Sequence, residues 1–465
     1  MGVELIKSKN NFGYIYSNTL NAFSLCTIDI IEECKYSLWN QVGYFDDINI
    51  DFMTNYDLSK IKMNLANMRQ LLIEVTDACN LQCKYCGYGE LYANYDKREA
   101  KQQQFENVKL LIDRLSELWR SEYNTSYNKN ITVGFYGGEP LMNMRLIKET
   151  IAYLESLQDI NVSFSYNMTT NGVLLNKYMD FLVEKNFKLL FSLDGNEYNS
   201  GYRVDKQGRG SFDKVLSNIK LIQSTYPDFF DKNVNFNAVL HDRNSVEDVF
   251  SFIKQEFGKT PRVAELNTNG LSEKGKEELQ HMFNSRYDSF DKASEAFKSK
   301  EDTQLEDSAA TFFHTFVRDF CGNYYNSYVD LFDSEDSTTY IPTGTCRPFE
   351  RKIFLTVNGK ILPCEKMGQN HVLGFLKDGI LDLDYEKVGK YYHDMYEKVI
   401  KNCKTCFLQK TCGQCMFLLE EKDGKLICPG YMGKNKSTDY FAHYLSYAEE
   451  HPDLYESVMS TIAID

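Results

Sequence analysis

The chain has 465 residues, a formal net charge of −14 at neutral pH and thirteen cysteines. This acidic balance argues against a general nucleic-acid binder, which needs clustered cations to contact phosphates. Thirteen cysteines are too sparse for a disulfide scaffold. The sequence shows neither a signal-peptide pattern nor an apolar run of about 18 residues that would span a bilayer. We therefore expect a cytoplasmic protein of about two or three domains.

The first 68 residues differ in pattern from the middle of the chain. Phe12–Tyr16 and Ala22–Ile28 are predicted as short strands, and Thr27–Leu38 and Tyr56–Met63 as helices. One interpretation is an extension that packs over the following domain. The other is a small domain of separate function.

Strand patterns alternate with amphipathic helical patterns from residue 70 to residue 270, as is typical of a parallel sheet built from βα units. The expected strands are Gln70–Val75, Thr132–Tyr136, Ser163–Met168, Lys188–Leu193, Asn235–Leu240 and Arg262–Leu266. Six units are fewer than the eight of a closed barrel, so we expect an α/β fold with a partial, open (β/α)6 TIM-like barrel.

Three cysteines follow the first expected strand with the spacing Cys79-x3-Cys83-x2-Cys86, and Tyr85 precedes the third. Three thiolates can hold three irons of a [4Fe–4S] cube and leave the fourth iron open for a ligand. A zinc site, a redox pair and a disulfide are the alternatives. Zinc usually takes four ligands in paired sets, and no fourth ligand lies nearby in sequence, so the spacing favours iron–sulfur.

Unusual residues also lie at the ends of the next strands. Because the βα loops of such a barrel meet at one face, we expect these residues beside the cysteine loop. The Gly-Gly, Asn-Gly and Asp-Gly pairs at these ends are by themselves common turn signals. Together, beside the cysteine loop, they indicate a binding site. In chain order they are Gly137, Gly138, Glu139, Asn171, Ser192, Asp194 and, further downstream, Arg203.

These motifs together resemble the radical S-adenosylmethionine (SAM) enzymes over about residues 70–270. The resemblance implies that the cluster at Cys79, Cys83 and Cys86 binds the amino and carboxylate groups of SAM through its open iron. It implies an ammonium site at the Gly-Gly-Glu motif, a ribose site at the fourth strand end and an arginine for the carboxylate. The implied SAM-binding residues are Tyr85, Gly137, Gly138, Glu139, Asn171, Ser192, Asp194 and Arg203.

Seven more cysteines lie in the last third of the chain. A zinc ribbon is the alternative for them, but its cysteine pairs are usually separated by about 15–20 residues, and here the pairs lie much closer together. Their spacing resembles the SPASM extension of peptide-modifying radical SAM enzymes, although two residues rather than three separate the last pair. They are Cys346, Cys364, Cys403, Cys406, Cys412, Cys415 and Cys428.

The SPASM resemblance implies two auxiliary [4Fe–4S] clusters, and therefore three clusters in all. Cys321 is either the fourth ligand of the inner cluster or a buried structural thiol, and Cys26 and Cys34 are expected in the core. The implied ligands are Cys346, Cys364, Cys415 and Cys321 for auxiliary cluster I, and Cys403, Cys406, Cys412 and Cys428 for auxiliary cluster II.

The resemblance implies an oxidative peptide maturase. In such enzymes a 5′-deoxyadenosyl radical takes a side-chain hydrogen, and a thioether or carbon–carbon crosslink is installed in a ribosomally made peptide. A sulfatase maturase that makes formylglycine is the alternative in the same superfamily, and a non-catalytic iron–sulfur sensor is the alternative from another class. The expected partners are a precursor peptide with a leader and a ferredoxin- or flavodoxin-type protein, with no nucleic acid or membrane; no catalytic side chain can be assigned.

The resemblance also suggests a domain plan. A small winged-helix-like domain that recognises the peptide is expected at residues 1–68, in competition with the packing extension. The radical SAM barrel is expected at 69–270, a polar helical bridging insert at 271–345, and the SPASM domain with a C-terminal helix at 346–465.

Overall fold

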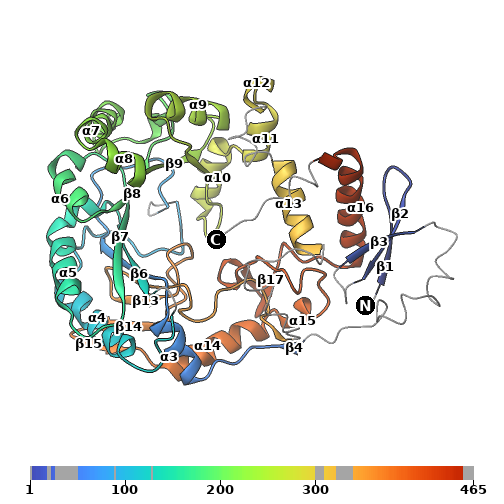
Figure 1. The fold of residues 1–465 in the computed structure, drawn as a ribbon, viewed down its shortest axis with the longest axis horizontal. Helices are drawn as coiled ribbons and strands as arrows, with labels where there is room; N and C mark the ends of the chain where they lie inside the picture. Colours follow the sequence, from blue (N-terminus) through green and yellow to red (C-terminus); the bar gives the residue numbers. More distant parts are fainter. Residues whose placement is uncertain are drawn as a thin grey trace. The chain divides into compact units, whose positions relative to one another are not determined.

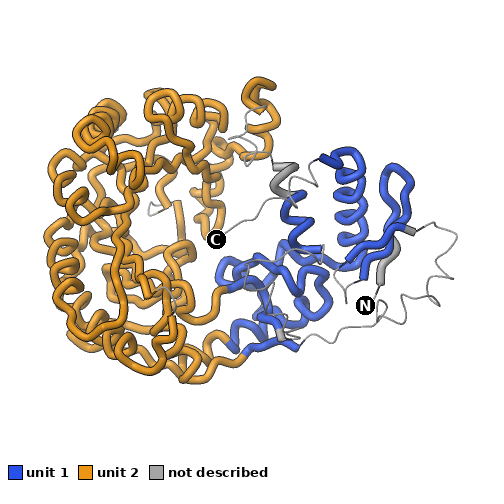
Figure 2. The backbone as a smooth tube through the Cα atoms, viewed as in Figure 1, with its two compact units in different colours: residues 1–54, 304–345, 393–465 blue, residues 55–303, 346–392 orange. Residues whose placement is uncertain are grey.

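The computed structural model describes residues 3–17, 22–26, 51–87, 91–126, 129–298, 308–320 and 339–453. The chain divides into two compact units (Figure 2). Unit 1 contains Met1–Thr54, Gln304–Thr345 and His393–Asp465, and unit 2 contains Asn55–Thr303 and Cys346–Tyr392. Neither unit is continuous in sequence, so this division differs from the linear domain plan.

The sheet of unit 2 begins with six neighbouring parallel strands, in the order β10-β9-β8-β7-β6-β5. The six expected βα strands are confirmed, with shifts of one or two residues at some ends. The strands are β5 (Gln70–Thr76), β6 (Asn130–Gly137), β7 (Ser163–Thr170), β8 (Lys188–Ser192), β9 (Val234–Leu240) and β10 (Arg262–Glu265).

Helices cover the outer face of this sheet (Figure 1). The helices are α3 (Leu58–Ala66), α4 (Phe105–Trp119), α5 (Met144–Ser156), α6 (Met179–Glu184), α7 (Phe212–Thr225), α8 (Pro227–Asn233) and α9 (Val246–Phe257). In α4, for example, an apolar stripe of Val108, Leu111, Ile112 and Leu115 is buried. Short 3-10 turns are η2 (Pro140–Asn143), η3 (Leu175–Lys177) and η4 (Asn199–Tyr202), and α10 (Glu273–Met282), α11 (Arg286–Asp291) and α12 (Glu295–Lys298) follow β10.

A late segment extends the same sheet. Strand β12 (Lys352–Leu355) pairs parallel with β5, and its residues Ile353, Phe354 and Leu355 are buried. Strands β13 (Lys360–Leu362), β14 (Gly374–Lys377) and β15 (Ile380–Asp382) then add antiparallel. Residues 346–392 thus belong with the barrel, whereas the sequence plan placed them in the C-terminal domain. The apolar run of β12 needs a partner edge, and β5 offers one.

In unit 1 the N-terminal strands share a core with distant helices. The strands β1 (Val3–Lys7), β2 (Gly13–Ser17) and β3 (Ala22–Cys26) form an antiparallel sheet. Ile6 and Tyr16 pack in one cluster with Phe316 and Phe320 of α13 (Ser308–Phe320) and Phe441 of α16 (Lys434–Glu450). The N-terminal segment is therefore integrated with the C-terminal part of the chain.

Some expectations fall outside the described residues. These are the expected helix Thr27–Leu38, Cys34, Cys321 and the side chain of Cys26.

The remaining elements are one longer helix, α14 (Tyr385–Glu397), and several short elements. Among the described helices, none combines the length and apolar character needed to cross a membrane. The short elements are β4 (Asp51–Phe52), β11 (Thr339–Tyr340), α15 (Ile400–Cys403), η6 (Met416–Leu418), β16 (Glu420–Lys422) and β17 (Lys425–Ile427).

Candidate active site

The loop that carries Cys79, Cys83 and Cys86 leaves the C-terminal end of β5, and all three thiols are free. Backbone bonds hold it against a second loop: the N–H of Gln82 donates to Val204 O at 2.7 Å, and that of Lys84 to Tyr202 O at 3.1 Å. The chain thus presents three thiols from one anchored loop. This donor set fits three corners of a [4Fe–4S] cluster.

The glycine pair after β6 locks this loop to the neighbouring strand. The N–H of Gly138 donates to Thr76 O at 2.9 Å, and the N–H of Glu139 donates to Ala78 O at 2.9 Å. A Cβ on Gly137 would stand 2.1 Å from Thr76 O, and one on Gly138 would stand 2.1 Å from Ala78 O. Gly137 also has a φ of +133°. Close backbone approach therefore requires both glycines.

We expect Gly138→Ala to reduce the free energy of unfolding by about 1–3 kcal/mol, because the added methyl group overlaps the backbone beside Cys79. The displaced loop should also retain less iron after reconstitution. Urea denaturation and iron analysis measure the two effects. Gly210→Ala is the control, since a Cβ there meets nothing within 4 Å; equal stability of the two variants would contradict the locking role.

Glu139 connects the third strand end to the cysteine loop. Its buried carboxylate accepts hydrogen bonds from Thr170 Oγ1 at 2.7 Å and from the N–H of Asn171 at 2.8 Å. Burial raises the pKa of Glu139 to about 6, against the lowering effect of these donors. The Nδ2 of Asn171 in turn donates to Asn80 Oδ1 at 2.8 Å and lies 3.7 Å from Cys79 Sγ. Glu139 thus positions Asn171 beside the first cysteine.

Asp194 and Arg203, which the sequence assigned to the ribose and carboxylate of SAM, are bonded to each other. Arg203 donates from Nε and Nη2 to the two carboxylate oxygens of Asp194, at 2.9 and 2.8 Å. Tyr85 OH and the N–H of Val239 donate to the same carboxylate. Asp194 is fully buried and Arg203 is 8% exposed. In this structure the pair anchors Tyr85, and thereby the cysteine loop, to β8 and β9.

The charges of this pair are strongly stabilised. Burial alone would raise the pKa of Asp194, but the guanidinium of Arg203 and several hydrogen bonds hold that pKa well below its usual range. The direct assignment of either side chain to SAM stays a prediction. Ser192, at the end of β8, lies next to Asn237 of β9 in the sheet, and its assignment also stays a prediction.

Sequence reasoning missed His241, Asn80 and Arg98. His241 directly follows β9, is fully buried, and lies with its Nε2 3.7 Å from Asp194 Oδ2 and its ring 5.6 Å from that of Tyr85. Its position just after β9 could have identified it, because the other site residues were chosen for lying at the C-terminal ends of strands. Asn80 lies inside the cysteine motif, whereas Arg98, whose Nη2 donates to Cys86 Sγ, carries no signal in sequence.

A polar cavity of about 260 Å³ lies among the strands of unit 2. It extends from the N-terminal ends of several strands to Tyr136 and Thr169, each next to the last residue of its strand. Such a space can admit a substrate side chain toward the strand ends. Its polar lining includes Gln70, Tyr136, Asn167, Thr169, Lys188, Asn235 and Arg262.

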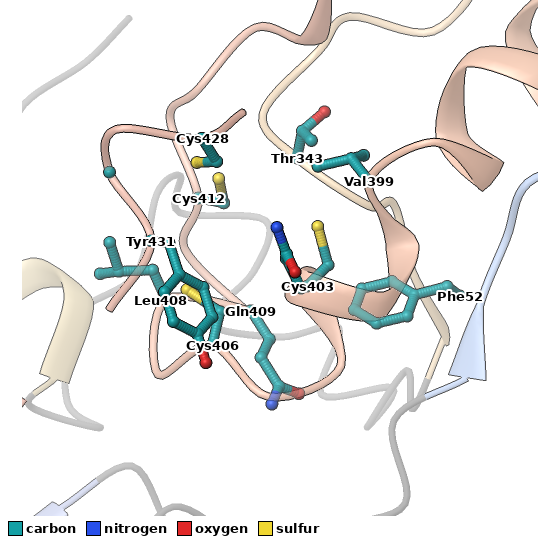
Figure 3. A pocket seen from close by; sticks show the side chains of 12 residues that line it. Phe52, Thr343, Val399, Cys403, Cys406, Leu408, Gln409, Cys412, Cys428 and Tyr431 are labelled. Carbon is teal, nitrogen blue, oxygen red and sulfur yellow. The ribbon is translucent and has the colours of Figure 1, made fainter. Parts of the chain in front are cut away.

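Four C-terminal cysteines line one cavity in unit 1, as Figure 3 shows. Burial, together with the neighbouring thiols of Cys412, Cys406 and Cys428, raises the pKa of Cys403 to about 12. Four thiols around one cavity fit a fully protein-ligated [4Fe–4S] cluster. Within the described ranges, no three His, Cys, Asp or Glu side chains are arranged to hold a single metal ion. These four are the expected ligands of auxiliary cluster II.

The expected ligands of auxiliary cluster I do not lie in one unit. Cys346 and Cys364 belong to unit 2 and Cys415 to unit 1, and Cys321 lies outside the described residues. Burial, together with the charge of Glu365, raises the pKa of Cys364 to about 12. The inner cluster therefore stays a prediction.

Residues 73–255 match the Radical SAM superfamily. This segment contains the three-cysteine loop and the ends of β5 to β9, so the chain carries a radical SAM domain on an α/β fold with a parallel central sheet. The resemblance inferred from the motifs is confirmed at this level.

Several characterised proteins are similar to part of the chain. A cysteine-type anaerobic sulfatase-maturating enzyme of Clostridium novyi is 29% identical over 197 residues, which cover 41% of this chain and 49% of that protein. The radical SAM cyclopropyl synthase TigE of Paramaledivibacter caminithermalis is 23% identical, covering 43% and 40%. The chain thus spans about half the length, or less, of these relatives.

The solved structure of native anSMEcpe with bound AdoMet resembles this fold with a TM-score of 0.53 and 18% identity, covering 84% of this chain and all of that one. A structure of the same protein with AdoMet and the Cp18Cys peptide has a TM-score of 0.54 and covers 85% and 100%. At 18% identity, this similarity shows a shared fold and nothing further.

Proposed function

We propose that this protein is a radical SAM enzyme that oxidatively modifies a ribosomally made peptide. The observation that carries the proposal is the three-thiol loop, locked by Gly137, Gly138 and the Tyr85–Asp194–Arg203 network at the C-terminal ends of the strands. When bound, the cluster and SAM supply a radical able to remove hydrogen from an unactivated carbon. The protein holds the thiols, orients the peptide and excludes water.

The peptide substrate would use the cavity among the strands, whose lining extends to Tyr136 and Thr169, each one residue before the end of its strand. A crosslink between two side chains, a thioether or a carbon–carbon bond, removes two electrons from the peptide overall. Auxiliary clusters are suited to accept surplus electrons, and the four-thiol cavity supports one of them. We propose three [4Fe–4S] clusters in total, a small ferredoxin- or flavodoxin-type electron donor, and a cytoplasmic location.

We retain the proposal that the N-terminal segment recognises a leader peptide. Its three-stranded antiparallel sheet supports this, because an extended peptide can add a strand to a sheet edge. The shared core with α13 and α16 supports the alternative of a packing extension. Deleting residues 1–68 would expose this core, so leader binding is better tested with the full chain.

Formylglycine formation is the second candidate, because two kinds of sulfatase-maturating enzyme are among the relatives. The two candidates differ in product: a crosslink joins two residues, whereas formylglycine is an aldehyde on one residue.

We expect the reconstituted enzyme to form 5′-deoxyadenosine from SAM under dithionite and to modify a short peptide encoded beside its gene. The expected product has lost two hydrogen atoms, joins two residues in tandem mass spectra and does not react with a hydrazide. A sulfatase-derived peptide that acquires a hydrazide-reactive aldehyde would favour the second candidate. Absence of 5′-deoxyadenosine from an iron-loaded preparation would contradict both.

A further inference from the structure

A positively charged side chain contacts the three-cysteine loop from a part of the chain that none of the motifs includes. Nη2 of Arg98 donates to Cys86 Sγ at 3.2 Å. This is short for a bond between nitrogen and sulfur, and Arg98 is partly buried there.

The backbone around Arg98 is fixed to the root of the same loop. The N–H of Glu99 donates to Asp77 Oδ2 at 2.9 Å, and Asp77 N–H donates to Lys101 O at 3.3 Å. Asp77 stands two residues before Cys79, so the segment that carries Arg98 and the loop that carries the thiols share one anchor. The guanidinium is therefore held at the cysteines by its backbone as well as by its own bond.

The bond from Arg98 to Cys86 places the positive charge of the guanidinium directly at one of the three thiols. A fixed positive charge near a metal centre favours its more negative state.

We propose that Arg98 is a positioning residue that raises the reduction potential of the cluster at Cys79, Cys83 and Cys86. This inference rests on the proposed function, since it needs a cluster at these thiols. Three thiolates on a [4Fe–4S] core carry net negative charge, and reduction adds one electron. The guanidinium stabilises the reduced state more than the oxidised one. Hydrogen bonds to the sulfurs are a general means of setting such potentials.

The test is a redox titration of the full-length, anaerobically reconstituted protein, without SAM. The cluster is followed by its EPR signal, identified beforehand as the signal that changes shape when SAM is added. We expect Arg98→Gln to keep the wild-type iron content while the ratio of reduced to oxidised cluster at a fixed potential falls about tenfold. For one electron this ratio corresponds to a midpoint potential about 59 mV lower.

Arg98→Met is the second neutral variant and should show the same shift if glutamine disturbs the loop. Arg98→Lys keeps the charge without the planar fork, so its potential should lie between those of wild type and Arg98→Gln. Arg114→Gln, an exposed arginine of α4, is the control and should leave the potential unchanged. If iron-loaded Arg98→Gln and Arg98→Met both have the wild-type potential, the inference about Arg98 is wrong while the proposed function stands. Absence of any SAM-responsive signal in the wild type would overturn the proposed function as well.

Discussion

Changing Cys79, Cys83 and Cys86 together to alanine should remove about four of some twelve irons per chain and abolish 5′-deoxyadenosine formation. The three thiols come from one loop at the end of β5, and Figure 3 shows that the four-thiol cavity is built from other residues. Iron and sulfide analysis after anaerobic reconstitution gives the count, and chromatography of the SAM products gives the activity.

The matched control is the variant with Cys403, Cys406, Cys412 and Cys428 changed to alanine. It should also lose about four irons, but it should retain the EPR signal that responds to SAM. Stoichiometric zinc without sulfide in the wild type would contradict the iron–sulfur assignment. Equal loss of the SAM-responsive signal in both variants would show that the two sites do not assemble independently.

Asp194→Ala should destabilise the protein by about 3–5 kcal/mol even without SAM, because it leaves the buried charge of Arg203 without its partner. It also removes the acceptor of Tyr85 OH, so the cysteine loop should hold less iron. Urea denaturation of the iron-free protein measures the first effect. Removing both charges, as in Asp194→Leu with Arg203→Met, should recover part of the loss.

Glu117→Ala is the control for this prediction, because its exposed pair with Arg114 on α4 should contribute only about 0.2–1 kcal/mol. The lowered pKa of Asp194 sets the pH dependence: its contribution is fully present above the carboxyl's unfolded pKa and is lost as the pH falls below that value. If Asp194→Ala is as stable as wild type but binds SAM weakly, the direct SAM contact expected from sequence is the better explanation.

Local patterns predicted the barrel well. Strands β5 to β10 have the parallel order that alternating βα units imply, and each has buried apolar residues, such as Leu71 of β5 and Val263 of β10. The cysteine spacing identified the three-thiol loop because those ligands lie within eight residues of one another. The resemblance to the SPASM pattern grouped Cys403, Cys406, Cys412 and Cys428, and these four line one cavity. Their role as ligands of auxiliary cluster II stays a prediction.

Other parts of the site depend on contacts that sequence does not encode locally. Glu139 was expected to face the ammonium of SAM, yet in the structure it positions Thr170 and Asn171. Asp194 and Arg203 have the charges expected for ligand binding, but two opposite charges buried side by side pair with each other. Only the fold shows which acceptor lies nearest to a given donor.

The sequence by itself thus determined where the cluster loop, the strand ends and the group of C-terminal cysteines lie, because these features depend on residues that are neighbours along the chain. Tertiary structure alone decided that β12 extends the barrel sheet, that the N-terminal strands share a core with α16, and that Arg98 contacts Cys86. These are long-range pairings, set by which buried edge, apolar face or charge finds a partner once the chain has folded.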